Sequence, residues 1–304
     1  MSGKAKRSGT IQLKVLVENA TGRLRAAGVE TPALDAEVLM AAAAGVTRER
    51  LHAATIAVDD ALRERYGALI EMRAARMPLA YIVGQREFYS LEFEVTPEVL
   101  IPRPETEGLV EAALIFIERR PAARAIDLGT GSGAIAIALA ANAPRVKIVA
   151  TDISAEVLAL AARNAARNRV ASRVEFRRAD WWTVSDGGAP LGRFDLIVAN
   201  PPYICTSEIA TLAPEVRDFE PRLALDGGAD GLDFYRRIAA GARDHLEPGG
   251  ALMVEVGEGQ AGAVVAIFRA AELGEISVVN DLAGIERVVG AVSMQEPGVL
   301  RRPD

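Results

Sequence analysis

The 304-residue chain contains few of the side chains that usually bind metals or form covalent cross-links. Its single cysteine, Cys205, excludes an internal disulfide. Its two histidines, His52 and His245, are distant in the sequence, and together with one cysteine they do not make a usual zinc ligand set. We therefore expect no metal site, and nothing calls for an oxidising compartment, so we expect a cytoplasmic protein.

Long apolar runs and an excess of basic charge are also missing. Apolar stretches such as residues 112–117 are far too short to cross a bilayer, and the basic segment 1–10 has no apolar stretch behind it. We expect neither a signal peptide nor membrane association. The chain has 35 Lys and Arg against 41 Asp and Glu, a formal net charge of -6. Because nucleic-acid-binding domains are usually basic, the composition favours a protein or small-molecule substrate.

The hydrophobic pattern of the first part of the chain is helical. The length of the chain suggests roughly two domains. Leu13, Val17 and Ala20 recur at helical spacing, and Thr31 before Pro32 is typical of a helix start. A further helix is expected over about 59–76. We predict a disordered tail over residues 1–10 and a small all-helical domain over residues 11–85.

The period changes between residues 86 and 100. Phe88, Leu91, Phe93 and Val95 favour a short β-hairpin that serves as a linker over residues 86–100. The following segment, 101–107, reads Ile-Pro-Arg-Pro-Glu-Thr-Glu, and its two prolines favour an extended backbone that ends abruptly. A helix is expected to begin near Glu107.

Short β-rich runs alternate with helical stretches from residue 123 onward, which predicts a mostly parallel, doubly wound sheet. The predicted strands are Arg124–Leu128, Lys147–Asp152, 173–177, Phe194–Ala199, 251–256, 276–280 and 287–292. The predicted helices are 134–141, 155–168, 231–245 and 260–271. The last two strands are close in sequence and should form an antiparallel hairpin at one end. We thus expect a Rossmann-like α/β domain with seven strands over residues 101–304.

The first of these strands runs into a glycine-rich turn formed by Gly129, Thr130, Gly131, Ser132 and Gly133. Glycines at a strand-to-helix turn let the backbone approach a ligand closely. Asp152, at the end of the next strand, can accept hydrogen bonds from both hydroxyls of a ribose. The pattern also fits a dinucleotide-binding turn or a packing turn without a ligand. Asp127 beside the turn repels a pyrophosphate and suits the cationic methionine part of S-adenosylmethionine.

The strand over residues 173–177 is followed by Asp180, Trp181 and Trp182. A carboxylate can accept from an adenine amino group, and an indole can cover an adenine face, so this segment supports the same cofactor. Either tryptophan can equally be an ordinary packed aromatic.

The fourth strand leads directly into Asn200-Pro201-Pro202-Tyr203. An amide or aryl amino nitrogen is a poor nucleophile because its lone pair is delocalised. Hydrogen bonds from its two N–H groups to the Asn200 side-chain oxygen and the Pro201 carbonyl would aim that lone pair at a methyl donor. The rigid prolines leave no competing N–H, and Tyr203 can lie flat on a planar amide or base. The alternative is an ordinary helix start or turn.

In several segments the chain resembles the HemK/PrmC family, which methylates the glutamine side chain in the Gly-Gly-Gln motif of peptide chain release factors. The segments that carry this resemblance are 34–39, 78–88, 101–107, 129–133, 200–203 and 220–225. The Asn-Pro-Pro-Tyr segment is shared with adenine and guanine amino-methyltransferases, so it indicates only the type of nitrogen. The Ile-Pro-Arg-Pro-Glu-Thr-Glu segment is far more specific to this family.

The resemblance implies a role for each matching position. S-adenosylmethionine would be held by Gly129, Thr130, Gly131, Ser132, Gly133, Asp152 and Asn200, with Trp181 beside the adenine. The substrate glutamine would be held by Asn200, Pro201, Pro202 and Tyr203, of which Asn200, Pro201 and Tyr203 are the catalytic candidates. The helical domain would help to dock the release factor, and we expect the enzyme to act as a monomer.

Two other functions remain open at this point. An amino-methyltransferase acting on adenine or guanine of RNA or DNA fits the same two motifs, but the acidic charge and the absence of a basic, aromatic-rich module argue against it. A non-catalytic protein that binds S-adenosylmethionine as a scaffold would have no use for two amide acceptors at Asn200 and Pro201.

Overall fold

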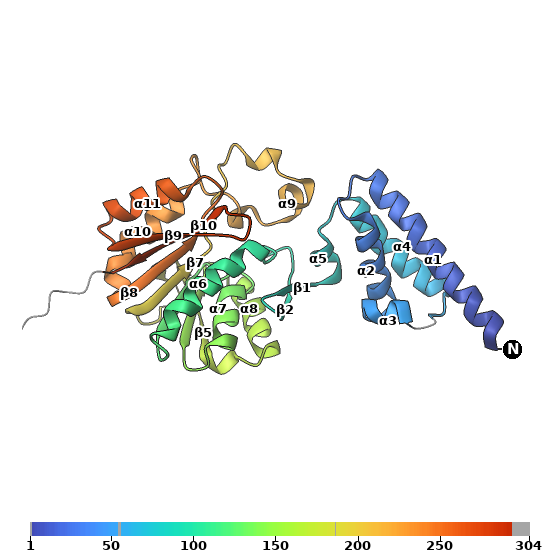
Figure 1. Ribbon diagram of the computed structural model, residues 1–304, viewed down its shortest axis with the longest axis horizontal. Helices are drawn as coiled ribbons and strands as arrows, with labels where there is room; N and C mark the ends of the chain where they lie inside the picture. Colours follow the sequence, from blue (N-terminus) through green and yellow to red (C-terminus); the bar gives the residue numbers. More distant parts are fainter. Residues whose placement is uncertain (1, 54–55, 186, 294–304) are drawn as a thin grey trace, which may run out of the picture. The chain divides into compact units, whose positions relative to one another are not determined.

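The computed structural model describes residues 2–53, 56–185 and 187–293. The chain divides into two compact units (Figure 1). One unit consists of Met1–Gly84 together with the short segment Ala213–Phe219, and the other of Gln85–Leu212 together with Glu220–Asp304. Their described elements show that the first unit is helical and that the second contains the main sheet. We call them the helical unit and the sheet unit.

The helical unit contains α1 (Ser2–Ala26), α2 (Pro32–Ala44), α3 (Arg48–Ala53), α4 (Asp60–Ala74), α5 (Leu79–Val83) and α9 (Pro214–Phe219). Because α1 begins at Ser2, the prediction of a disordered tail is wrong for residues 2–10, and Met1 lies outside the described residues. Extending an existing helix costs little, and Lys, Arg and Ala have good helix propensity. The amphipathic part of α1 thus serves as a nucleus for the polar residues before it.

The core of the helical unit forms between α1, α2 and α4. Leu24, Leu39 and Met40 are fully buried, and the Tyr66 hydroxyl donates to the Ala36 carbonyl at 3.1 Å. Thr31 stands directly before α2, as predicted, but its side chain makes no capping hydrogen bond. Its hydroxyl instead donates to Asp35 Oδ1 at 2.7 Å, so Thr31 supports a buried charge.

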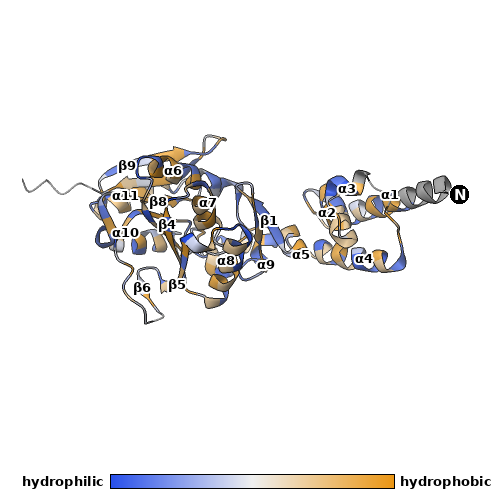
Figure 2. Cartoon of the chain, turned by 90° about the horizontal axis from the view of Figure 1, so that it is seen from below, coloured by the Kyte–Doolittle hydropathy of each residue, from blue (hydrophilic) through white to orange (hydrophobic). Residues whose placement is uncertain are grey.

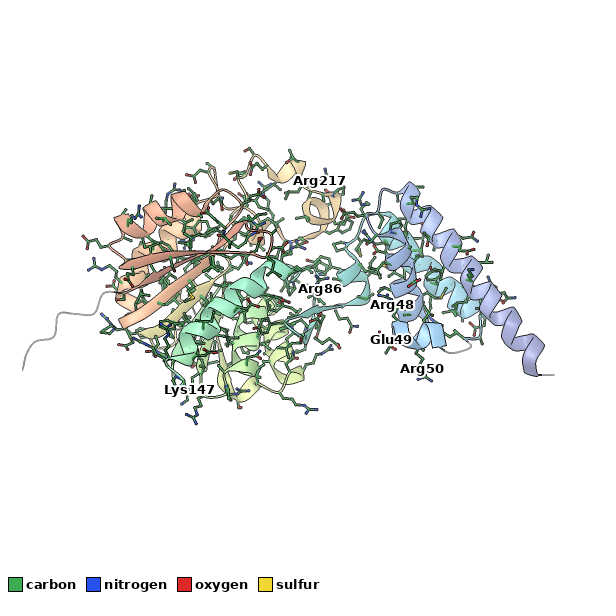
Figure 3. The ribbon with its side chains drawn as sticks, in the orientation of Figure 1. Arg48, Glu49, Arg50, Arg86, Lys147 and Arg217 are labelled. Carbon is green, nitrogen blue, oxygen red and sulfur yellow. The ribbon has the colours of Figure 1, made fainter. Side chains whose placement is uncertain are left out.

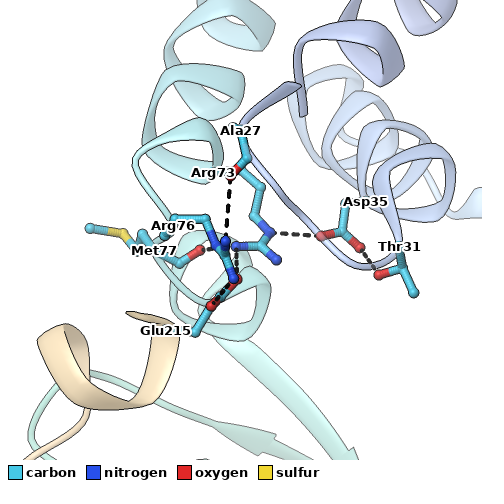
Figure 4. A network of polar contacts seen from close by, with 7 residues as sticks. All are labelled: Ala27, Thr31, Asp35, Arg73, Arg76, Met77 and Glu215. Atoms are coloured by element: carbon cyan, nitrogen blue, oxygen red, sulfur yellow. Dashed lines mark hydrogen bonds and ion pairs between the residues drawn. The ribbon is translucent and has the colours of Figure 1, made fainter. Parts of the chain in front are cut away.

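A network of charged side chains lies inside the helical unit (Figure 4). The buried Arg73 guanidinium on α4 is 2.7 Å from Asp35 Oδ2 on α2 and 3.0 Å from Glu215 Oε1 on α9. Arg76 donates to both oxygens of Glu215, at 2.7 and 2.6 Å. These contacts hold α9 within the helical unit, although the chain on both sides of it belongs to the sheet unit.

The hairpin predicted as a linker over residues 86–100 forms from β1 (Gln85–Phe88) and β2 (Leu91–Glu94), which pair antiparallel. It belongs to the sheet unit. Phe88 and Phe93 are buried in the core of that unit, and Asn164 hydrogen-bonds both the backbone N–H and the carbonyl of Glu94, at 2.7 and 3.0 Å. The segment is therefore packed into the sheet unit, whereas a linker would have few such contacts.

The sheet consists of β3 (Arg124–Leu128), β4 (Lys147–Asp152), β5 (Val174–Asp180), β6 (Thr183–Val184), β7 (Phe194–Ala199), β8 (Leu246–Glu255), β9 (Glu275–Asn280) and β10 (Glu286–Val292). Within the described residues it has eight strands in the order β6-β5-β4-β3-β7-β8-β10-β9. The five neighbouring strands β5, β4, β3, β7 and β8 pair in parallel. Strands β9 and β10 form the predicted antiparallel hairpin. The eighth strand, β6, was not predicted, because a strand of two residues is too short to show an alternating hydrophobic pattern.

Helices cover both faces of this sheet. The longer ones are α6 (Glu107–Glu118), α7 (Ala134–Asn142), α8 (Ala155–Arg167), α10 (Asp233–His245) and α11 (Ala261–Ala270), and single 3-10 turns occur at Pro104–Thr106, Ala171–Arg173, Ile209–Thr211 and Arg222–Ala224. One core packs α6 and α7 against strand residues such as Ala125, and the other packs α10 and α11 against residues such as Ile126. Consecutive strand residues thus point to opposite faces. Figure 2 shows α7 as hydrophobic over most of its length.

The strand order places β3 beside β7, where the sequence of crossovers reverses direction. In such sheets, ligands bind beyond the carboxyl ends of the strands at this switch point. The glycine-rich turn follows β3 and Asn200 follows β7, so the topology brings these two predicted segments together. Lys147 begins β4 at the opposite edge and is exposed to solvent (Figure 3).

Candidate active site

A cavity of about 520 Å³ lies in the sheet unit at the carboxyl ends of β3, β4, β5 and β7. Its wall also includes residues from the segments 98–106 and 221–224 and from the start of α10. The volume is typical of sites for cofactors and small substrates. Of the predicted site residues, eight line the cavity: Gly129, Thr130, Gly131, Ser132, Asp152, Trp181, Asn200 and Pro202.

The glycine-rich turn needs its glycines for two different reasons. Gly129 and Gly131 have φ angles of 72° and 54°, in the region that L side chains rarely adopt, and both line the cavity. Gly133 does not line it. A Cβ on Gly133 would lie 2.8 Å from Ile137 Cδ1 and 3.3 Å from Ala161 Cβ. Gly133 therefore allows α7 and α8 to pack closely, and its predicted contact with the cofactor is not supported by its position.

Asp152 presents its carboxylate at the end of β4. Oδ2 accepts from the Gly131 N–H and Oδ1 from the Ser154 N–H, both at 3.1 Å. Burial raises the pKa of this carboxyl, and these backbone hydrogen bonds act in the opposite direction. A carboxylate oxygen can accept more than one hydrogen bond, so both oxygens keep capacity for a ligand hydroxyl.

Asp127 differs from the prediction that placed it beside the cofactor. It is fully buried and does not line the cavity. Its Oδ2 accepts from the Thr130 hydroxyl at 2.6 Å and from the Ala136 N–H at 3.3 Å, so Asp127 holds the glycine-rich turn in place from its buried side. Burial raises the pKa of Asp127 to about 7. Its Oδ1 has no hydrogen-bond partner within the described part of the chain.

The aromatic wall of the cavity comes from Trp181 and Phe234, whose ring centroids are 5.0 Å apart. Arg237 lies near both rings and also pairs with Asp180 at 2.8 Å. An indole and a cation in this arrangement can hold a flat heterocycle. Trp182 lies outside the cavity wall: its ring stacks on that of His245 with the centroids 4.4 Å apart, and its Nε1 donates to the Arg237 carbonyl at 3.1 Å.

Asn200 follows β7, and its side-chain nitrogen is anchored. Nδ2 donates to the Thr106 hydroxyl oxygen at 3.1 Å, and Thr106 is buried. No donor among the described residues hydrogen-bonds the Asn200 side-chain oxygen. Because Asn200 lines the cavity, its oxygen can accept a hydrogen bond from a group bound there.

The backbone of the following three residues is held from several sides. Gln260 Nε2 donates to the Tyr203 carbonyl at 2.8 Å. A Cβ on Gly227 would lie 2.8 Å from both the Pro202 oxygen and the Tyr203 Cα, so only glycine fits there. The Pro201 carbonyl accepts no hydrogen bond from the residues that the structure describes, and it therefore keeps its acceptor capacity, although buried Pro201 does not line the cavity.

Tyr203 also stays outside the cavity wall, so its predicted contact with a flat substrate group remains a prediction. Burial raises the pKa of its hydroxyl to about 12. The hydroxyl is consequently neutral at physiological pH and is not a general base.

Several residues of the cavity wall were not predicted as site residues. Arg103, Thr106 and Leu223 come from the segments 101–107 and 220–225, whose family-specific sequences were the available signal. Phe234 and Arg237 lie on α10, where nothing in the local sequence marks them. Only the packing of α10 onto the sheet brings these two side chains to the cavity.

Among the described residues, no three His, Cys, Asp or Glu side chains gather as metal ligands. No helix in the same ranges has both the length and the hydrophobicity that crossing a membrane requires.

The fold with its cavity is that of class I methyltransferases. The model of the methyltransferase small domain matches residues 110–215, and that of the PrmC N-terminal domain matches residues 16–84. The structure of the hMettl16 catalytic domain, solved in complex with the MAT2A 3'UTR hairpin 6, is similar with a TM-score of 0.56. It is 17% identical, over 75% of this chain and 83% of that one, and therefore supports the fold alone.

Curated relatives are similar over almost their whole length. The release factor glutamine methyltransferase of Cereibacter sphaeroides is 48% identical over 90% of this chain and 95% of that protein. The protein of the same name from Geobacter sulfurreducens is 45% identical over 91% of this chain and 95% of its own length. The chain belongs to the release factor glutamine methyltransferase family, which confirms the resemblance identified from the sequence. This family and fold imply the use of S-adenosylmethionine.

Proposed function

We propose that this chain transfers a methyl group from S-adenosylmethionine to the side-chain amide nitrogen of the glutamine in the Gly-Gly-Gln motif of peptide chain release factors. The observation that carries the proposal is the Asn200 amide. Its nitrogen donates a hydrogen bond to Thr106, which leaves its oxygen to accept a hydrogen bond from an N–H of a group in the cavity. The names of the curated relatives support a glutamine as that group.

The residues around the cavity fit the cofactor. The turn at Gly129 and Gly131 lets the protein backbone approach the ligand closely, Asp152 keeps acceptor capacity for two ribose hydroxyls, and Trp181 offers a flat face for adenine. The cavity volume of about 520 Å³ suits a ligand of this size. When bound, S-adenosylmethionine supplies an electrophilic methyl group.

The chain's own contribution is to orient the amide nitrogen. The Asn200 side-chain oxygen accepts one N–H, and the Pro201 carbonyl accepts the other. With both N–H groups bound, the nitrogen lone pair would point at the methyl group, and the reaction would gain from orientation. Transfer of the methyl group would release S-adenosylhomocysteine, and the methylated nitrogen would lose one of its two protons to water, so no side chain has to remove that proton beforehand. Gln260 and the glycine at 227 keep the acceptor backbone rigid. Neutral Tyr203 contributes a flat surface beside the amide.

The helical unit is proposed to help dock the release factor. We also propose that the enzyme acts as a monomer in the cytoplasm. Its formal net charge of -6 gives no general attraction to nucleic acid, which makes methylation of a base in RNA or DNA the weaker alternative.

Mass spectrometry of a purified release factor, after incubation with this protein and labelled S-adenosylmethionine, tests the proposed function. We expect one added methyl group on the glutamine of the Gly-Gly-Gln motif. A release factor with alanine in place of that glutamine is the matched control and should stay unlabelled. Label that enters total RNA or DNA while the release factor remains unmodified would show that the substrate is a nucleobase.

Asp152→Asn should weaken cofactor binding about 10- to 100-fold, because the neutral amide keeps only one acceptor oxygen for the ribose. Titration calorimetry with S-adenosylhomocysteine measures the change. Asp244→Asn, on an exposed part of α10 outside the cavity, serves as the control and should bind normally. An unchanged dissociation constant for Asp152→Asn would show that this carboxylate does not bind the ribose.

A further inference from the structure

A large apolar side chain in the cavity wall is exposed to solvent. Leu223 lines the cavity, and 79% of its surface is accessible. A single exposed leucine elsewhere on a protein surface is ordinary. In the wall of a binding cavity, however, the same side chain offers apolar area to the molecule that binds there. Leu223 is therefore placed to contact a ligand at the rim of the cavity.

The backbone that carries Leu223 is held in place. It forms the 3-10 turn Arg222–Ala224. The Arg222 carbonyl accepts from the Asp226 N–H at 2.9 Å, and the Arg222 guanidinium lies 3.0 Å from the Asp226 carboxylate. Leu225, which follows the turn, is buried and anchors the segment in the sheet unit. The exposure of Leu223 thus comes from an ordered turn, and its position exists before any ligand binds.

Backbone pairing joins this turn to the segment proposed to bind the substrate amide. Ile204, which directly follows Tyr203, donates its N–H to the Leu225 carbonyl at 3.0 Å. The Ile204 carbonyl in turn accepts from the Gly227 N–H at 2.8 Å. The chain on the carboxyl side of Leu223 is consequently fixed against the end of the Asn-Pro-Pro-Tyr segment.

An ion pair joins the other side of the turn to residues 101–107. The Glu220 carboxylate, whose side chain is only 1% exposed, accepts from Arg103. In the same segment, the Thr106 hydroxyl oxygen accepts from the Asn200 amide at 3.1 Å. Both connections thus lead to Asn200, whereas the proposed cofactor contacts come from the ends of β3, β4 and β5. Leu223 therefore belongs to the substrate side of the cavity.

We propose that Leu223 contacts the peptide that carries the substrate glutamine, packing against the methylene groups of that side chain and against the backbone of the glycine before it. The proposal rests on the proposed function for the identity of the substrate. The methylene stem of the glutamine has to pass the rim of the cavity when its amide reaches Asn200. Because a glycine has no side chain, its backbone can come within van der Waals distance of a leucine.

Steady-state methylation of the release factor tests this contact. Leu223→Ala should raise KM about tenfold with little change in kcat, because the lost apolar contact forms on binding and persists in the transition state. Leu223→Met keeps the apolar volume and should restore most of the affinity. Leu282→Ala is the matched control, since Leu282 is also exposed but lies between β9 and β10, outside the cavity. An unchanged KM in Leu223→Ala would overturn the proposal.

Titration calorimetry with S-adenosylhomocysteine, in the absence of release factor, separates the substrate from the cofactor. Leu223→Ala should change this affinity by less than about threefold, because the leucine is assigned to the peptide. A loss of affinity for S-adenosylhomocysteine as large as the rise in KM would show that Leu223 covers the cofactor, and the proposal would then be wrong.

A double-mutant cycle identifies the part of the substrate that Leu223 contacts. Alanine in place of the glycine before the glutamine adds a methyl group where the peptide should meet Leu223, and it should lower kcat/KM about fivefold with the unchanged enzyme. With Leu223→Ala the same change in the release factor should cost much less. Additive effects would contradict the contact with this glycine.

The same experiments distinguish failure of the contact from failure of the proposed function. A release factor that the unchanged enzyme does not methylate would rule out the proposed function and, with it, this contact. A release factor that is methylated with the same KM by the unchanged enzyme and by Leu223→Ala would leave the function in place and rule out the contact alone.

Discussion

Asn200→Ala should lower kcat for methyl transfer by about 10³-fold, a loss similar to that seen when one preorganised hydrogen-bonding group is removed from an active site. The reason is that the amide nitrogen of the substrate reacts only when its lone pair is aimed. One of the two acceptors that aim it is the Asn200 oxygen, which no other described residue engages. The Pro201 carbonyl alone leaves the amide free to rotate.

Single-turnover methylation of the release factor measures this loss without interference from product release. Cofactor affinity, followed by calorimetry, should change by less than about threefold if Asn200 acts mainly on the substrate. Asn142→Ala is the matched control, because Asn142 is an exposed asparagine at the end of α7. A near-normal rate in Asn200→Ala would rule out the hydrogen-bond role, and a large loss of cofactor binding would move Asn200 to the cofactor side of the cavity.

The fold was predictable wherever the hydrophobic period of a segment and its spacing from neighbouring strands indicate the same element. The strands Arg124–Leu128, Lys147–Asp152 and Phe194–Ala199 end where they were predicted to end, because each is a short apolar run bounded by polar or turn residues. The antiparallel pair at one end of the sheet followed from the short connection between its strands. Residues 2–10, by contrast, are helical, since a helix can extend through residues that show no amphipathic pattern.

The site was predictable where it is made by strand ends. Parallel strands place their carboxyl ends on one edge, so Gly129, Asp152 and Asn200 could be grouped from the sequence. Asp127 was misplaced because it lies only two residues before Gly129. Asp127 is buried within its strand whereas Gly129 lines the cavity, and the sequence pattern does not distinguish these two positions. Arg237 could not be predicted, because its place in the wall depends on how α10 packs.

The network around Glu215 could not be predicted either, because it joins residues far apart in the sequence. Arg73 is 142 positions from Glu215 and 38 from Asp35. The contacts at helical spacing, from Thr31 to Asp35 and from Arg73 to the Met77 carbonyl, do not indicate that these charges meet. Only the return of the chain into the helical unit as α9 brings the carboxylate of Glu215 to the two arginines.

Arg73→Met should destabilise the helical unit by about 3 kcal/mol, because it leaves the buried Asp35 carboxylate without its cation while keeping most of the packed side-chain stem. Glu215 should be less affected, since Arg76 still donates to both of its oxygens. Arg48→Met removes an exposed pair with Glu37 at 3.6 Å and should cost less than about 1 kcal/mol. Loss of the buried pair is therefore expected to lower the free energy of unfolding more than loss of the exposed pair.

Hydrogen exchange followed by mass spectrometry resolves this prediction by element. Peptides from α2 and α4 should lose protection in Arg73→Met, those from α9 should lose less, and those from β3 and β4 provide an internal control. Equal loss in all elements would indicate global unfolding and contradict the local role. Burial raises the pKa of Glu215, but hydrogen bonds from Arg76 and Arg73 outweigh it, and the net pKa is lowered. Its stabilising contribution is thus complete above the pKa of an unfolded glutamate and is lost as the pH falls through the folded-state pKa, so acid should selectively increase exchange in α9.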